Sequence, residues 1–222
     1  MLLHIQDFDY FLAYIRLDEL KKYLDITEKY LQKAKADFDA WTDEQVKNLP
    51  PGQRQEFYDF YQDDYWQYAE KFPRILRNSF LVSACSLLEF EMDVFCKKLE
   101  EGQQIPISWN KLTGDKLERV KNYCKLVKLE LSYNGQIWQE INRYYKVRHC
   151  IAHTSGLLKK LTDKDKKDLL PYLTEKRIIS QDTIEQEIAL TKQFCEEVIN
   201  TMQNFLNEVY TAYEAQKERK NP

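Results

Sequence analysis

The chain has 222 residues, 31% of them charged, and a formal net charge of −3. This near-neutral total gives no sign of a chain that binds nucleic acid through its overall charge, and the length suffices for a core without disulfides or structural metals. Only five glycines and six prolines are present, which favours long helices over short strands.

The charge is unevenly distributed along the chain. Residues 1–72 carry 15 acidic and 9 basic side chains, whereas residues 140–180 carry 10 basic and 5 acidic ones. Any polyanion should therefore prefer the second region.

Apolar residues recur at alternating spacings of three and four, which predicts amphipathic helices packed in a bundle. The sequence Pro50-Pro51-Gly52 should break the first of them, and Pro73 should either kink the second or open the third. Asp182 and Glu185 are expected to cap the last helix. The predicted helices cover residues 17–41, 54–72, 81–99, 117–131, 137–151 and 184–212, and residues 157–181 are predicted to form one extended loop.

These patterns predict an all-α chain in which a helical extension, residues 1–72, packs on a bundle formed by residues 73–222. The five cysteines show no metal-binding spacing, and Cys85, Cys124 and Cys195 fall on apolar helix faces, as buried thiols do in a reducing compartment. No apolar run reaches the length of a membrane span, and the start lacks the basic leader of a signal peptide. We expect a cytoplasmic protein that does not bind membranes.

One segment, Arg148 to His153, departs from the helical pattern. Arg148 occupies a position where the apolar spacing calls for Leu or Ile, and an unpaired buried charge would cost several kcal/mol. His153 follows five residues later, close to Gly156. An ideal helix separates the two side chains by about 140°, but a chain that unwinds at this point could turn both towards one anion.

The segment Arg148-His149-Cys150-Ile151-Ala152-His153 resembles the R-x4-6-H motif of HEPN domains. The stretch FPRILRNSFLVSACSLLEFEMDVFCKKLE looks like the long helix of that family, and GDKLERVKNYCKLVKLELS with IWQEINRYYKVRHCIAHTSG is similar to the two helices that lead into the motif. The resemblance covers residues 72–156 well and the last helix more loosely. Many members carry Asn after the arginine, where this chain has His149.

The resemblance implies a HEPN-like bundle of four to five core helices and metal-independent cleavage of RNA at a homodimer interface. It also implies a toxin or antiphage-defence effector with an antitoxin or defence-system partner protein, and no cofactor. A histidine can accept the proton of an attacking 2′-hydroxyl, and a guanidinium can hold phosphoryl oxygens. Arg148, His153 and His149 are then catalytic.

Each assignment has an alternative. The module could have lost catalysis and bind RNA, a nucleotide or a partner protein, or Arg148 could be purely structural. His149 and His153, four residues apart, could hold zinc, although a third histidine is missing nearby and we expect no metal site. Glu89 is either a carboxylate at the rim of the bundle or the partner that orients Arg148 or His153.

The roles of two further segments each have two interpretations. The aromatic residues between Phe57 and Tyr68 are better explained by core or subunit packing than by base stacking, because neighbouring acids repel phosphate. The lysines after the motif form either a solvated loop or a rim that gathers phosphate. The predicted RNA-binding rim consists of Arg143, Lys146, Lys159 and Lys160.

Overall fold

The computed structural model describes residues 7–101, 107–180 and 186–220, and it confirms the all-α prediction. Within these ranges the chain forms helices and two isolated β-bridges but no strand. The helices are α1 (Phe8–Lys47), α2 (Arg54–Phe60), α3 (Gln62–Trp66), α4 (Phe72–Glu101), α5 (Lys116–Leu126), α6 (Gln136–Thr154), α7 (Asp163–Glu175) and α8 (Lys192–Lys220), with short turns at Pro51–Gln53, Gln67–Lys71, Trp109–Lys111 and Leu158–Lys160.

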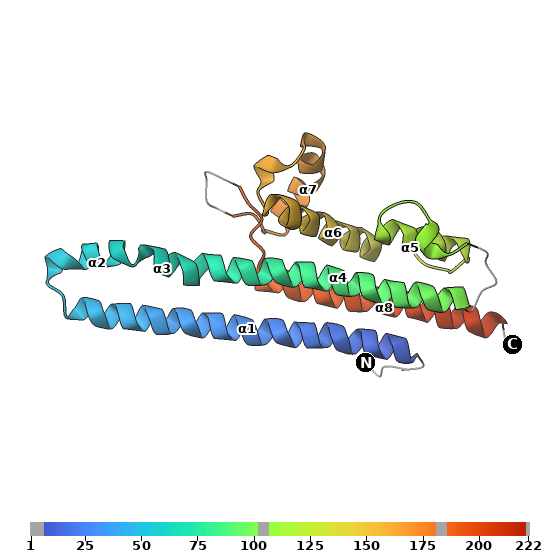
Figure 1. The fold of residues 1–222 in the computed structure, drawn as a ribbon, viewed down its shortest axis with the longest axis horizontal. Helices are drawn as coiled ribbons and strands as arrows, with labels where there is room; N and C mark the ends of the chain where they lie inside the picture. Colours follow the sequence, from blue (N-terminus) through green and yellow to red (C-terminus); the bar gives the residue numbers. More distant parts are fainter. Residues whose placement is uncertain (1–6, 102–106, 181–185, 221–222) are drawn as a thin grey trace.

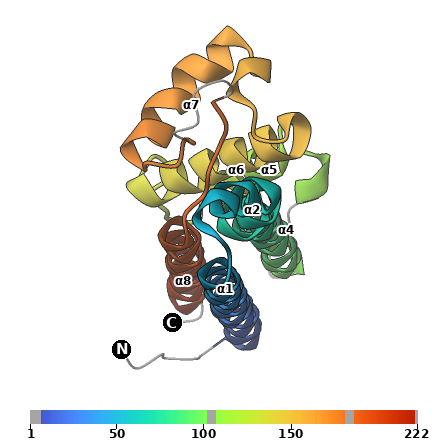
Figure 2. The same ribbon diagram turned by 90° about the vertical axis from the view of Figure 1, so that its left-hand side faces the viewer.

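Three long helices, α1, α4 and α8, run alongside one another, and each contacts the other two. Helix α6 packs on both α4 and α8, and α5 and α7 flank it on the same side (Figures 1 and 2). The three long helices form a triangular bundle, and the smaller group of helices lies on its α4–α8 side, away from α1 (Figure 2). No helix in the described ranges is long and apolar enough to cross a membrane.

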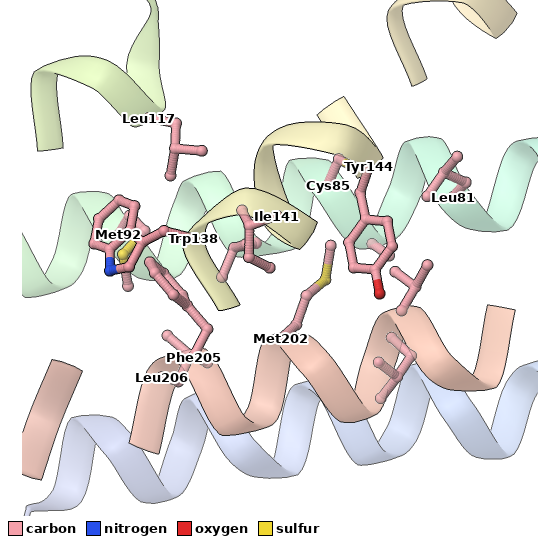
Figure 3. Close-up of a cluster of buried hydrophobic side chains, with 14 of the residues drawn as sticks. Leu81, Cys85, Met92, Leu117, Trp138, Ile141, Tyr144, Met202, Phe205 and Leu206 are labelled. Atoms are coloured by element: carbon pink, nitrogen blue, oxygen red, sulfur yellow. The ribbon is translucent and has the colours of Figure 1, made fainter. Parts of the chain in front are cut away.

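The core lies where α6 meets α4 and α8, and Figure 3 shows side chains from these helices interdigitating there. Trp138 of α6 stacks edge-to-face on Phe205 of α8, with ring centroids 4.7 Å apart. Cys85, Cys124 and Cys195 are fully buried, as predicted. The N-terminal half of α1 belongs to the same core, where Ala13, Leu17 and Leu24 are fully buried.

The predicted helix over residues 54–72 is interrupted in the structure. Helices α2 and α3 are short, and a π-helical turn, Gln67–Lys71, leads directly into α4. Pro73 follows this turn at the second position of α4. Because proline lacks a backbone N–H, it cannot continue an α-helical hydrogen-bond pattern from the preceding residues, and a local change of helix type accommodates it.

Three predictions on the C-terminal half were wrong. The supposed loop contains α7, which begins at Asp163 and is capped by Thr162, whose hydroxyl accepts a hydrogen bond from the Asp165 N–H. The last helix begins at Lys192 rather than near residue 184, because residues 186–190 are extended and Thr191 caps α8 by accepting from the Phe194 N–H. The predicted cap residues Asp182 and Glu185 lie outside the described residues. The helix predicted over 117–131 ends at Leu126, after which Lys128 adopts a left-handed conformation.

Candidate functional site

The segment Arg148–His153 lies in the last two turns of α6. The apolar face of this helix is fully or almost fully buried against α4 and α8, which fixes the rotation of α6 about its axis. The buried residues of that face are Trp138, Ile141, Tyr144, Val147 and Cys150. The remaining side chains of the segment are therefore placed by core packing rather than by local contacts.

The end of α6 is held by backbone hydrogen bonds. Ser155 and Gly156 both take positive φ values, 56° and 80°, and the Gly156 N–H donates to the Cys150 carbonyl at 3.3 Å. An extended segment then pairs with the turn, since the Ile188 N–H donates to the Gly156 carbonyl at 2.9 Å and the Leu158 N–H donates to the Gln186 carbonyl at 3.0 Å. The chain leaves α6 in a fixed direction immediately after the motif.

Arg148 is half-buried and makes no hydrogen bond or ion pair with the described residues. Its Nε atom is buried without an acceptor. The guanidinium lies near the buried Cys85 thiol, whose pKa is raised to about 12 mainly by burial, while the positive charge of Arg148 opposes this shift and Glu89 adds to it. Glu89 follows Cys85 by one turn of α4, so the Cys85 thiol is under the influence of both charged groups.

Arg148, His149 and Glu89 line one cavity of about 340 Å³ between α4, α5, α6 and α7. The lining carries four carboxylates and three cations, so the cavity has no excess of positive charge. Two of the cations are engaged within the chain, because Lys116 pairs with Asp93 at 2.7 Å and Lys146 pairs with Asp168. Arg148 is the lining cation that remains without a carboxylate partner in the described structure.

His153 lies outside this cavity, on the exposed surface beside His149. The two imidazole rings are in contact, with centroids 4.3 Å apart. The helix does not unwind after Arg148 but continues to Thr154. The suggested convergence of Arg148 and His153 on one anion is therefore not seen within a single chain, because residues five apart on a regular helix point in different directions.

The two assignments for Glu89 remain open. Its carboxylate lines the same cavity as Arg148 and His149, as an orienting partner would. The structure records no hydrogen bond or ion pair between Glu89 and Arg148, both of which it describes.

The four residues of the predicted RNA-binding rim lie in two different places. Arg143 pairs with Glu140 at 2.7 Å and lies over the Tyr172 ring, and Lys146 pairs with Asp168, so acidic side chains of the same chain already neutralise both. Lys159 and Lys160 are exposed in the turn Leu158–Lys160, directly after the end of α6.

Sequence reasoning missed two residues of α6 that line the cavity, Asn142 and Tyr145. The Tyr145 hydroxyl donates to the Cys85 carbonyl at 3.2 Å and ties α6 to α4. A signal for Asn142 was present, because Asn142, Lys146, His149 and His153 follow one another at helical spacings and so form a polar line along α6. Tyr145 carries no such signal, since a tyrosine beside an apolar face is ordinary packing.

Among the described residues no three His, Cys, Asp or Glu side chains gather as ligands for a metal ion would. Comparisons of the chain with protein-family models, with curated proteins and with solved structures found no match.

Proposed function

We propose that this chain is a metal-independent endoribonuclease of the HEPN type, in which His153 transfers the proton and Arg148 holds the phosphoryl group. The observation that carries the proposal is the end of α6, where Arg148 has no carboxylate partner and two neighbouring imidazoles are exposed. A toxin or antiphage-defence effector, acting with an antitoxin or another partner protein, is the setting that the resemblance implies.

The reaction would be an attack of the RNA 2′-hydroxyl on the adjacent phosphorus. A bond forms between the 2′-oxygen and phosphorus, and the bond from phosphorus to the 5′-oxygen breaks. His153 accepts the 2′-hydroxyl proton, and the departing 5′-oxygen takes up a proton from water, which leaves a 2′,3′-cyclic phosphate and a 5′-hydroxyl. The histidine supplies proton transfer and the arginine supplies positive charge, so these steps need no metal.

Arg148 suits the role of phosphoryl ligand because its guanidinium is not committed to another side chain of the described structure. A planar guanidinium can donate two parallel hydrogen bonds to phosphoryl oxygens and stabilise charge that develops in the transition state. His149 lines the Arg148 cavity and contacts His153, and it therefore lies between the two groups. We assign His149 the task of positioning His153 and binding the phosphate.

A second chain completes the site in this proposal. Because α6 stays helical, Arg148 and His153 of one chain cannot both face the same phosphate. A two-fold homodimer that joins the exposed ends of two α6 helices would place Arg148 of one chain opposite His153 of the other. Lys159 and Lys160, exposed beside this end of α6, would then flank the bound RNA.

A second function is favoured by one observation, the charge of the cavity. Four carboxylates among its lining residues repel phosphate, whereas a cavity of about 340 Å³ with amide, hydroxyl and carboxylate groups suits a small neutral or cationic group. A module that binds a nucleotide base or a partner's side chain without cleaving RNA would use the cavity and not require His153.

The proposal is tested with a single-stranded RNA and the same oligonucleotide carrying 2′-deoxyribose throughout. We expect the protein to cleave only the ribose form in the presence of EDTA and to leave 2′,3′-cyclic phosphate ends. Cleavage of the deoxyribose form, or of RNA to 3′-hydroxyl ends, would rule out attack by the 2′-hydroxyl. Binding without cleavage would favour the non-catalytic module.

A further inference from the structure

The distal end of the α1–α4 hairpin is an exposed surface that the proposed RNA cleavage does not use. We define the distal arm as residues 37–70, which comprise the end of α1, α2, α3 and most of the π-helical turn. Figure 1 shows the arm extending past the start of α8, beyond the group of α5, α6 and α7. Only Thr42 and Val46 are buried in it.

The arm contains nine aromatic residues, and they divide into two sets. An inner set, Phe38, Phe57, Tyr61 and Tyr68, is half-buried, and the Phe38 and Tyr68 rings, 5.3 Å apart, join α1 to the returning chain. An outer set remains exposed to solvent by 39% to 77% of each residue. The outer set consists of Trp41, Tyr58, Phe60, Tyr65 and Trp66.

Such a cluster of exposed aromatic side chains is unusual for a surface that faces only water, and aromatic residues are enriched at the centres of protein interfaces. Trp41 also contacts the Phe57 and Tyr61 rings and so helps the inner set to hold the hairpin together. All five outer residues nevertheless keep at least 39% of their surface exposed, and that surface is available to another molecule.

The charge of the arm defines the chemistry of that molecule. The arm carries nine acidic and two basic residues. Most of its carboxylates form no ion pair with the described residues; those without one include Asp37, Asp43, Glu44, Glu56, Asp63 and Glu70. A strongly acidic surface repels nucleic acids and anionic lipid headgroups.

Two copies are a poor fit arm to arm, because that contact would bring like charges together. Three of the ten cations of the basic region, Arg143, Lys146 and Lys176, are already paired with an acidic residue of their own chain.

We propose that the distal arm binds a basic segment of another protein, in which lysine or arginine alternates with apolar side chains. The outer aromatics would receive the apolar side chains and place ring faces against the cations, and the free carboxylates would pair with the remaining charges. The proposal concerns a surface separate from the end of α6, so it does not depend on the proposed RNA cleavage.

The experiment uses the full chain and two short fluorescein-labelled peptides, followed by fluorescence anisotropy. One peptide consists of lysine, arginine, leucine and tryptophan, and the other carries glutamate in place of each cation. We expect the basic peptide to bind and its affinity to fall as salt is added. The glutamate peptide should not bind.

Two double variants locate the contact. Phe60→Ser with Trp66→Ser removes exposed rings, and Asp43→Asn with Glu44→Gln removes charge near the C-terminus of α1, where acids do not stabilise a helix. Each pair of substitutions should lower the affinity for the basic peptide by about tenfold or more. The matched control is Glu175→Gln with Glu218→Gln, which removes two exposed acids near the ends of α7 and α8.

The control pair should bind the basic peptide as the parent does, and all variants should keep the parent's helical circular dichroism. Failure of the parent to bind the basic peptide would overturn the proposal. So would equal binding of the glutamate peptide, or equal losses in the arm variants and the control pair.

Discussion

The imidazole rings of His149 and His153 lie 4.3 Å apart, measured between their centroids, at an interplanar angle of 44°. The contact is possible because α6 remains helical through Thr154, which places residues four apart on the same face. It keeps His153 beside His149 and turned away from the Arg148 side of the helix.

This geometry predicts that one site uses two chains. Arg148→Ala and His153→Ala should each lose most of the RNA cleavage alone, whereas a mixture allowed to exchange subunits should regain part of it. In a mixed dimer one of the two sites would have an intact Arg148 from one chain and an intact His153 from the other. Light scattering should show a dimer. A mixture that stays inactive although exchange is demonstrated would contradict a shared site.

The two left-handed residues after the motif predict opposite changes in stability. Ser155→Gly should raise the free energy of unfolding by about 1 kcal/mol, because glycine takes positive φ without steric cost. Gly156→Ala should lower it by about 1 kcal/mol through backbone strain. A Cβ there would meet Ile188 at an ordinary 3.6 Å, so the loss would not come from a clash. Urea unfolding measures both, and changes of the same sign would show that these φ values do not govern stability.

Much of the helical architecture could be predicted from the sequence, because apolar spacing records which face of each helix is buried. The same pattern misplaced the start of α8. Ile184 and Ile188 fit a helical spacing, but Ile188 instead donates a backbone hydrogen bond to Gly156 at the end of α6. A pairing between residues so far apart in the chain leaves no mark in local spacing.

The candidate site was predictable in part for a related reason. Arg148 stands out because it interrupts an apolar face, and His153 stands out because it precedes a left-handed turn. Tertiary packing determines which helices lie next to α6. The cavity that Arg148 shares with Glu89 and Asn142 could therefore not be predicted from the residue spacing within α6.

The buried carboxyl of Glu91 should make the stability of the fold depend on pH. Burial raises the pKa of this carboxyl above the ordinary glutamate value of 4.5, although a hydrogen bond from Arg16 at 2.9 Å opposes the shift. The folded state therefore holds the Glu91 proton more tightly than the unfolded state does. The resulting stabilisation is complete below the unfolded pKa and is lost as the pH rises through the folded value.

The measurement compares the parent with Glu91→Gln, which cannot titrate at this position. The free energy of unfolding of the parent relative to the variant should fall as the pH rises from about 4.5, the ordinary pKa of a glutamate carboxyl, towards neutrality. A difference that grows over this range would mean that the Arg16 pair, rather than burial, dominates.

The five cysteines predict a chain whose thiols react only after unfolding. All five are buried and free, and burial raises the pKa of Cys85, Cys124 and Cys195 to about 12. Because the thiolate is the reactive form, a disulfide reagent should find almost no thiol in the folded protein at pH 8. All five should react in denaturant. Rapid reaction of any thiol in the folded chain would place it at the surface.

The central claim, that His153 transfers a proton during RNA cleavage, is tested most directly by the cleavage rate of single-stranded RNA in EDTA. His153 is exposed at the end of α6, so His153→Ala should melt close to the parent and lose no core packing. We expect the variant to be slower by roughly 100- to 10,000-fold, the usual contribution of general acid–base catalysis. A folded His153→Ala variant that cleaves RNA at the parent's rate would contradict the account.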